Sequence, residues 1–424
     1  MLSIAPPYDG AVRLGDVANE GAARFGKPLD DVRILAAEQM QALPFGTQLL
    51  TRFGAEVVKV EHPHHGESGR QSLPAVTDPA GRKVGATFLR NNLNKRSVGI
   101  DLKQDRGREL FLALAPHFDV VAENFKSGTM DRLGLGYEAV AKVHPQVVYL
   151  SISGFGSGPS PYRDWSAYAS IAEAMSGLYE YTRKPHQPPA VGAAGALGDT
   201  STAMFGVIGV LAALRHRDRT GEGQHVDVAM LDSMVVMADI VPNFWSLGLE
   251  RGGTSPTIFD GFEAADGWFV IQVSREHQFE RLAKLVGRPE WVDDPRFARR
   301  EQWRDHLEDT IRPAIEEWAS TLPKQEACAT LAAAGIAAGP SNGPEDVVTD
   351  PHVVAHNMLV EVPRPDGVER PVLVSGNPVK MSKLAEGPET RMPWTGEHTD
   401  EVLRAELDLS DEQLADLRGD GVIA

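Results

Sequence analysis

The stretch Val32-Arg33-Ile34-Leu35, followed by the segment 47–53 and by Glu56-Val57-Val58-Lys59-Val60-Glu61, decides the fold of this chain. Short runs rich in β-branched residues predict strands, and the longer amphipathic segment between them predicts a helix. A strand, a helix and a second strand in this order form a βαβ unit, which makes the two strands parallel. The chain is therefore predicted to have an α/β fold.

The same alternation continues through the first half of the sequence. Further strands are expected at 98–101, 120–123, 147–152 and 226–228, with helices at 105–115 and 230–236. Repeated βα units of this kind predict a Rossmann-like parallel sheet. Because ligands bind at the carboxyl ends of such strands, the Gly-, Asn- and Pro-rich loops that follow them are the expected functional segments.

A change of character after residue 250 predicts a second, smaller α+β domain. A strand at 269–273 is followed by expected helices at 276–286, 305–319 and 324–334. We expect residues 1–236 to form the large domain and 250–350 the small one. Residues 355–424, which contain a turn at 363–367, are expected to return to the large domain.

Composition restricts the class of protein. The 424 residues carry 42 basic and 59 acidic side chains, a formal charge of −17, which argues against nucleic-acid and anionic-membrane partners. The single cysteine, Cys328, excludes an intrachain disulfide and suits a reducing compartment. No signal peptide and no apolar stretch of about 18 residues is recognisable. We expect a cytoplasmic protein.

Asp199 is the most informative single residue. It lies in Gly195-Ala196-Leu197-Gly198-Asp199-Thr200-Ser201-Thr202, directly before the apolar run 203–214, which predicts a buried helix. One interpretation is that Asp199 caps this helix, as aspartate often does. The other is that the helix N-terminus keeps the carboxylate ionised for attack on a carbonyl carbon.

Several motifs together resemble the class III CoA-transferases, whose relatives include formyl-CoA transferase, carnitine CoA-transferase and the α-methylacyl-CoA racemases. Each motif is weak alone, but their order and spacing resemble the family over most of the chain. The motifs are Phe53-Gly54-Ala55-Glu56-Val57-Val58-Lys59-Val60-Glu61, Asn94-Lys95-Arg96-Ser97-Val98-Gly99-Ile100-Asp101-Leu102-Lys103, Val121-Ala122-Glu123-Asn124-Phe125 with Asp131-Arg132-Leu133-Gly134, Ser153-Gly154-Phe155-Gly156, Gly198-Asp199, Arg219-Thr220-Gly221-Glu222-Gly223-Gln224 and Gly335-Ile336-Ala337-Ala338-Gly339-Pro340.

The resemblance implies a reaction and a nucleophile. CoA would move from an acyl-CoA donor to a carboxylic acid through an anhydride and then a CoA thioester of Asp199. Gly252 and Gly253 would supply N–H donors to the transient negative charge, although a plain turn is the alternative. A CoA thioester would be the substrate, and no tightly bound cofactor and no metal is expected.

Two further residues near the reacting group follow from the resemblance. Gln41 matches a glutamine that helps to hold the acyl group, but Leu43 stands where relatives have glycine, which puts the pocket shape in doubt. Gln41 could instead cap a helix. Tyr168 falls where racemases carry a histidine; a tyrosine is a poor base for an α-proton at pH 7, so the resemblance favours transfer.

Polar residues on the strand-end loops are the expected contacts for CoA, because its phosphates favour Arg and Lys side chains. Solvated surface charge is the alternative for each of them. The cluster His62, His64 and His65 lacks a repeated ligand spacing, so no metal site is expected there. The expected CoA contacts are Arg70, Asn94, Lys95, Arg96, Asn124 and Arg132.

Two alternative functions and two further expectations remain at this stage. A racemase or epimerase is the alternative within the family, and a non-catalytic CoA-binding module is the alternative outside it. Because relatives form interlocked dimers, we expect a homodimer in which the linkers 237–262 and 335–395 allow each chain to thread the other. Succinyl-CoA with a dicarboxylic or aromatic-substituted acid is the expected substrate pair.

Overall fold

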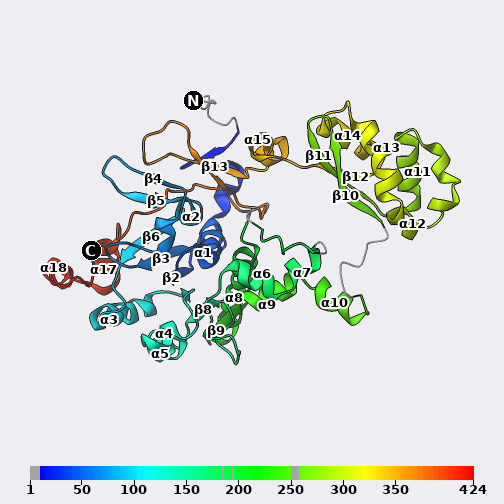
Figure 1. Ribbon diagram of the computed structural model, residues 1–424. Helices are drawn as coiled ribbons and strands as arrows, with labels where there is room; N and C mark the ends of the chain where they lie inside the picture. Colours follow the sequence, from blue (N-terminus) through cyan, green and yellow to red (C-terminus); the bar gives the residue numbers. More distant parts are fainter. Residues whose placement is uncertain (1–9, 184–185, 193–194, 250–256) are drawn as a thin grey trace. The chain divides into compact units, whose positions relative to one another are not determined.

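The computed structural model describes residues 10–183, 186–192, 195–249 and 257–424 (Figure 1). It divides into two compact units. The first comprises Met1–Val241 and Pro351–Ala424, and the second comprises Pro242–Asp350. The expected division was residues 1–236 with 355–424 for the large domain and residues 250–350 for the small one.

The first unit is built on a six-stranded sheet in the order β6-β3-β2-β7-β8-β9, and every neighbouring pair is parallel. In chain order this is third, second, first, fourth, fifth, sixth, which is the doubly wound Rossmann order. The predicted Rossmann-like α/β fold is therefore confirmed. The strands are β2 (Arg33–Ala37), β3 (Glu56–Glu61), β6 (Lys95–Gly99), β7 (Val120–Glu123), β8 (Val148–Ser153) and β9 (Gln224–Ala229).

Successive residues of these strands enter two separate cores, one on each face of the sheet. Leu35, Val121 and Tyr149 join the first core, whereas their neighbours Ile34 and Val120 join the second. This separation explains why the strands read as continuous apolar runs. The first core is covered by α3 (Asp105–Leu114) and α17 (Thr399–Leu407), and the second by α1 (Ala42–Arg52) and α8 (Leu197–Thr220).

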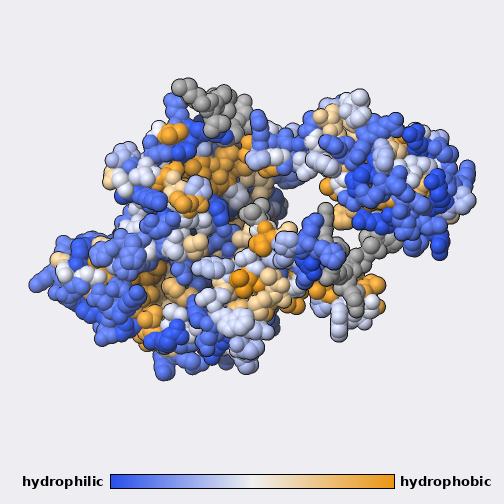
Figure 2. Space-filling model, in the orientation of Figure 1, coloured by the Kyte–Doolittle hydropathy of each residue, from blue (hydrophilic) through white to orange (hydrophobic). Residues whose placement is uncertain are grey.

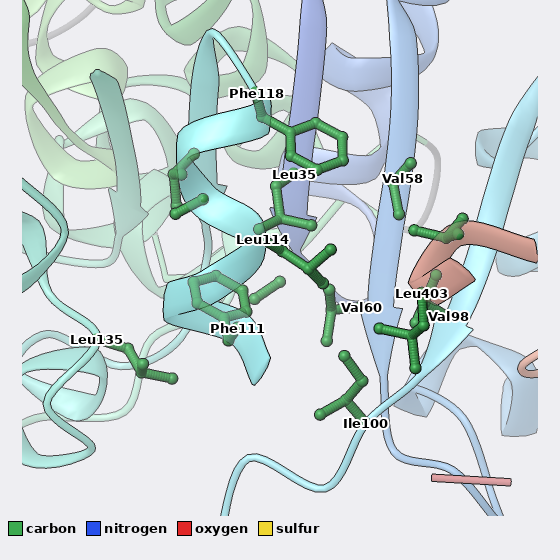
Figure 3. Packing of buried hydrophobic residues seen from close by; sticks show 14 of the residues in the cluster. Leu35, Val58, Val60, Val98, Ile100, Phe111, Leu114, Phe118, Leu135 and Leu403 are labelled. Atoms are coloured by element: carbon green, nitrogen blue, oxygen red, sulfur yellow. The ribbon is translucent and has the colours of Figure 1, made fainter. Parts of the chain in front are cut away.

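Figure 3 shows the first core in detail. Phe111, Leu114 and Phe118 lie against strand residues such as Val58, and Leu403 from the C-terminal segment packs beside Val98. The segment 351–424 thus supplies part of the core of the sheet that the N-terminal half forms. An isolated bridge between Ile100 and Ile423 joins the two segments again.

Helix α8 is longer than expected, because it begins at Leu197 rather than near residue 203 and ends at Thr220. Within the described residues it is also long and apolar enough to cross a membrane, judged by length and composition alone. The expectation that no such stretch exists was therefore wrong, because it considered only the run 203–214. In the structure α8 contacts α1, α9, β8 and β9, as a core helix does.

Smaller elements complete the first unit. A hairpin and a three-stranded sheet lie beside the main sheet, and the expected turn at 363–367 joins two strands of the latter. These strands are β1 (Val12–Arg13), β4 (Ala75–Thr77), β5 (Lys83–Gly85), β13 (Leu359–Val362) and β14 (Val372–Ser375). The remaining helices are α2 (Ala86–Asn91), α4 (Thr129–Arg132), α5 (Tyr137–Val143), α6 (Ala169–Met175), α7 (Leu178–Thr182), α9 (Met230–Met237), α16 (Pro351–Ala355) and α18 (Asp411–Gly419).

The second unit is an antiparallel sheet of three strands with helices packed on one core. Its strands are β10 (Ile258–Ala264), β11 (Gly267–Val273) and β12 (Ala337–Pro340), and its helices are α11 (Glu276–Leu285), α12 (Arg300–Asp305), α13 (Arg312–Ala319), α14 (Lys324–Ala333) and α15 (Pro344–Thr349). Helix α10 (Ile240–Ser246) spans the boundary.

The expected helix 305–319 is interrupted by a π-helical turn at Leu307–Ile311, next to Pro313, which has no N–H to donate to a regular helix. Cys328 lies buried in the core of this unit, where burial raises the pKa of its thiol to about 11.

Candidate functional site

The site lies where the strand order of the sheet reverses. Strands β2 and β7 are neighbours, but the chain leaves them toward opposite sides, so their carboxyl ends open a crevice. Asn124 holds the two loops at this crevice together. Its Oδ1 accepts the N–H of Gln39 at 2.8 Å, and its Nδ2 donates to the carbonyl of Gln39 at 2.9 Å.

A cavity of about 310 Å³ occupies this crevice. Residues 39–42 line it after β2, residues 124–127 after β7 and residues 152–155 after β8. The wall is completed by residues of the loop before α6, by Met230 at the start of α9, and by Asp199. Three of the expected site residues, Asp199, Gln41 and Tyr168, therefore share one cavity with Asn124.

Asp199 is the third residue of α8, and Ala196 holds the N-cap position with φ of 37°. The interpretation of Asp199 as the capping residue is therefore not what the structure shows. Gly198 permits a close approach of α8 to α6, because a Cβ at this position would lie 2.9 Å from the Cα of Ala169. This contact fixes the start of the helix that carries the carboxylate.

The environment of Asp199 favours its neutral form. Burial and, to a smaller extent, the nearby carboxylate of Glu173 together raise the pKa of Asp199 to about 6, while the charge of Arg90 opposes both. Glu173 is itself held in place, since its Oε1 accepts the N–H of Gly198 at 2.9 Å and its Oε2 accepts the hydroxyl proton of Tyr179. Near pH 7 most of the Asp199 side chains are ionised but more basic than an ordinary aspartate.

Gln41 occupies the N-cap position of α1 but makes no capping hydrogen bond with its side chain. Its Oε1 instead accepts a hydrogen bond from Nη2 of Arg90. Leu43, whose side chain put the pocket shape in doubt, is 1% exposed and packs in the second core with Ile34. The first turn of α1 directs this side chain toward the sheet, and Leu43 does not line the cavity.

Met40, between these loops, has a strained backbone with φ of 58°. Its N–H donates to Oε2 of Glu67 at 2.9 Å. Glu67 in turn lies 3.5 Å from Nζ of the fully buried Lys59, which is also 3.5 Å from Glu38. A buried set of charges thus supports the loop that carries Met40 and Gln41.

Tyr168 lies at the N-cap position of α6 and is 71% exposed. It lines the cavity and is not buried in either core, and its role near the reacting group stays a prediction. Phe155, Tyr162 and Trp165 form an aromatic cluster in which the ring centroids of Tyr162 and Trp165 lie 4.7 Å apart. Phe155 and Trp165 face the same cavity as Tyr168.

Five of the six expected CoA contacts do not line the cavity in the described structure, and four of these five have partners elsewhere. Lys95 is buried, and its Nζ lies 2.7 Å from Glu38; burial lowers the pKa of Lys95 to about 8. Arg70 is 2% exposed and donates to both carboxylate oxygens of Glu61. Because these two side chains lie in the interior and are paired with glutamates, they are not available to bind CoA.

The other two are engaged at the edge of the sheet. Arg96 pairs with Glu56 at 2.6 Å and with Glu401 at 3.0 Å. Asn94 adopts φ of 66°, and its Oδ1 accepts the N–H of Thr390. Both side chains join separate segments of the first unit, and their role as CoA contacts stays a prediction.

Basic residues that the sequence did not single out stand at the cavity. Lys126 and Arg163 line it. Arg132, which was among the expected CoA contacts, lies near Arg163. A Cβ added to Gly128 would lie 3.3 Å from Nη1 of Arg132 and 3.7 Å from Nη2 of Arg163, so the two guanidinium groups converge there. Lys126 lies in the loop that follows β7, where functional residues were expected, so the sequence could have identified it. Only the tertiary structure shows that Arg163 lines the cavity.

Two expectations concern other parts of the chain. Gly252 and Gly253 lie outside the described residues. The rings of His62 and His65 stack with their centroids 3.5 Å apart. Within the part of the chain that the structure describes, no group of three potential metal ligands is found.

Comparison with known proteins gives consistent matches. The family described as CoA-transferase family III matches residues 29–399. A succinyl-CoA:mesaconate CoA-transferase from Haloarcula hispanica is 37% identical over 88% of this chain and 95% of its own length. A formyl-CoA:oxalate CoA-transferase from Streptomyces avermitilis is 35% identical over 94% of this chain and its full length. A solved CAIB/BAIF family protein from Brucella suis has a TM-score of 0.78 and 33% identity, and the match covers 90% of this chain and all of that chain.

The raised pKa of Asp199 predicts a stability effect that depends on pH. A carboxyl whose folded-state pKa is about 6 contributes stability below its ordinary pKa, and loses that contribution as the pH rises through 6. Asp199→Asn should therefore raise the free energy of unfolding by about 2 kcal/mol above pH 7, and by much less near pH 4. Thermal unfolding at both pH values measures this difference. Asp218→Asn, at the exposed end of α8, is the control; an equal gain for Asp199→Asn at both pH values would contradict the assignment.

Proposed function

Because the chain belongs to CoA-transferase family III and is a CoA-transferase, we propose that Asp199 carries CoA between an acyl-CoA donor and a carboxylic acid acceptor. The observation that carries this proposal is the position of Asp199. A carboxylate at a helix N-terminus, with a raised pKa, faces a cavity at the reversal point of the sheet. Membership of this enzyme family argues against a non-catalytic CoA-binding module.

The first half of the reaction moves CoA onto the enzyme. A carboxylate oxygen of Asp199 attacks the thioester carbon, the C–S bond breaks, and CoA leaves as a thiolate with the bonding electrons. The product is an anhydride between the donor acid and Asp199. The thiolate then attacks the side-chain carbonyl of Asp199 and releases the donor acid as a carboxylate, which leaves a CoA thioester on Asp199.

The second half reverses these steps with the acceptor. The acceptor carboxylate attacks the thioester carbonyl of Asp199 and expels CoA thiolate, which gives a second anhydride. Attack of the thiolate on the acceptor carbonyl forms the new acyl-CoA and restores the carboxylate of Asp199. No proton is gained or lost over the cycle, so the reaction requires no general base.

The surroundings of Asp199 suit this chemistry. Burial and Glu173 make the carboxylate more basic, and therefore a better nucleophile, while leaving it largely ionised at pH 7. Positive charge at the start of α8 stabilises the oxyanions that develop during each attack. Gln41 stands in the same cavity and can donate its amide N–H to the acyl oxygen.

The basic side of the cavity supports a position for the nucleotide end of CoA. We propose that Lys126, Arg132 and Arg163 bind its phosphates, because two guanidinium groups converge beside Gly128 and Lys126 lines the adjoining loop. Backbone N–H groups of that loop can contribute further. The aromatic cluster of Phe155, Tyr162 and Trp165 then adjoins this part of the ligand.

Both acids are proposed from the relatives. The named enzymes from Haloarcula hispanica and Streptomyces avermitilis use succinyl-CoA with mesaconate and formyl-CoA with oxalate. We propose succinyl-CoA as donor and a dicarboxylic acid as acceptor for this chain. A racemase is the weaker alternative, since Tyr168 replaces the histidine that would exchange the α-proton.

A covalent adduct on Asp199 is the direct expectation. After mixing with succinyl-CoA, mass spectrometry of the peptide that contains Asp199 should show the added mass of CoA. Asp199→Asn should lack the adduct and lose transfer activity by at least about 1,000-fold, because it lacks the attacking oxygen. Asp218→Asn, on the same helix, should retain both. An adduct on another residue, or unchanged transfer by Asp199→Asn, would overturn the mechanism.

If Arg163 binds a phosphate of CoA, its replacement should weaken only the binding of substrates that contain the nucleotide. Arg163→Gln should raise the KM for succinyl-CoA by about 10-fold, since a hydrogen bond to a charged group is lost. With a succinyl-pantetheine thioester, which lacks the nucleotide, the variant and the unaltered enzyme should have the same KM. Steady-state kinetics with both substrates makes the comparison, and equal losses with both would place Arg163 elsewhere in the reaction.

A homodimer is also proposed. Exposed apolar side chains follow one face of α8, where Met204, Ile208 and Leu211 are 43, 60 and 39% exposed. Figure 2 shows hydrophobic surface in the region of α8 and α9 on the visible face. A single soluble chain rarely leaves such a face uncovered, and a second copy of the chain would bury it.

Light scattering tests the dimer. The unaltered protein should have twice the mass of the 46.0 kDa chain, and Ile208→Asp should be monomeric and much less active, because a charge would be buried in the contact. Val143→Asp, at a residue 48% exposed on α5, is the control and should remain dimeric. A fully active monomer of the unaltered protein would show that one chain has a complete site.

A further inference from the structure

Arg90 stands beside the reacting groups but has no place in the reaction described so far. It is near the end of α2, and its carbonyl accepts a hydrogen bond at 2.8 Å from the side chain of Gln48 on α1. Its side chain is exposed, and Nη2 donates to Oε1 of Gln41. The backbone of Arg90 is therefore fixed, and among the described residues its guanidinium group donates to Gln41.

The charge of Arg90 acts on Asp199 without forming an ion pair. Each of the two groups affects the charge of the other, yet no contact within 4.0 Å joins Arg90 to a carboxylate among the described residues. By contrast, Arg52 and Arg70 are each paired with a glutamate. In a chain with a formal charge of −17, Arg90 is thus a cation next to the nucleophile with donors available for an added anion.

We propose that Arg90 determines acid specificity by binding the carboxylate of a dicarboxylic acid that does not react, while the other carboxylate lies against Asp199. This inference rests on the proposed function of Asp199. It names a residue that selects the substrate, in addition to the residues that perform the transfer.

The chemistry of the cycle favours the carboxylate that does not react. The reacting carboxylate loses its charge when it becomes an anhydride or a thioester, so a cation bound to it would stabilise the starting state more than the later states. A carboxylate remote from the reaction keeps its charge throughout. Its attraction to Arg90 therefore lowers the energy of every state in the cycle and holds the acid in position.

The position of Gln41 supports the same division of roles. Its Oε1 accepts from Arg90, which leaves its amide N–H groups to face the acyl oxygen of the reacting carboxylate. Arg90 and Gln41 would then bind opposite ends of one short acid. The guanidinium group suits this role because it can donate two parallel hydrogen bonds to a single carboxylate.

Matched acids test the inference. Succinate and butyrate have the same number of carbons and differ in one carboxylate, and longer and shorter pairs can be compared in the same way. The unaltered enzyme should prefer the dicarboxylic member. Arg90→Gln should raise the KM for that member by about 10- to 100-fold with little change in kcat, and should leave the monocarboxylic member unchanged. Arg90→Lys should restore part of the preference, and Arg108→Gln, at an arginine of α3 that does not line the cavity, should have no effect.

Several results would overturn the inference. Equal losses with both acids would mean that Arg90 acts on the reacting group or only through Gln41. If the unaltered enzyme prefers no dicarboxylic acid of two to six carbons over its monocarboxylic match, or if Arg90→Gln leaves that preference intact, Arg90 does not select the acid.

One measurement separates this inference from the proposed mechanism. At saturating succinyl-CoA, Arg90→Gln should still acquire CoA on Asp199, as seen by mass spectrometry, whereas Asp199→Asn should not acquire it at any concentration. Loss of the adduct in Arg90→Gln at saturation would contradict the role of Arg90 alone. An adduct in Asp199→Asn would contradict the covalent mechanism. The preference for dicarboxylic acids, compared between the unaltered enzyme and Arg90→Gln, would still test the role of Arg90.

Discussion

The reversal of strand order between β2 and β7 is the constraint on which the site depends. Parallel strands require crossovers of one hand, so a chain that builds outward from β2 in both directions leaves a crevice at the carboxyl ends of β2 and β7. The loops that follow both strands must then meet. The paired hydrogen bonds of Asn124 with Gln39 fix this meeting point, and all the residues proposed to act on substrate are arranged around it.

Charge is distributed unevenly around the crevice. On one side, Glu173 and the partial burial of Asp199 oppose ionisation of the nucleophile, whereas the start of α8 and Arg90 favour it. On the other side, the guanidinium groups of Arg132 and Arg163 converge on Gly128. This separation gives one end of the cavity to the thioester and the acid and the other end to the phosphates, although the whole chain is acidic.

Beneath the crevice lies a buried network of charges that contacts no substrate in the proposed mechanism. Lys59 and Lys95 share the carboxylate of Glu38, and Lys59 also approaches Glu67. Burying four charges is costly, and such networks are retained where they fix a geometry. Here Glu67 holds the N–H of Met40, so the network supports the strained turn that presents Gln41 to the cavity.

The sequence by itself determined the parallel α/β sheet, because β-branched runs alternating with amphipathic segments can be buried in few other ways. It also identified Asp199, Gln41 and Tyr168, whose positions next to predicted elements are local properties of the chain. Only the tertiary structure determined which basic residues are buried in ion pairs and which lie at the cavity. Lys95 and Arg70 turn inward to carboxylates, while Arg163 lines the cavity and Arg90 contacts Gln41 beside it. These outcomes depend on contacts between strands and loops that are distant in sequence, which the local sequence does not show.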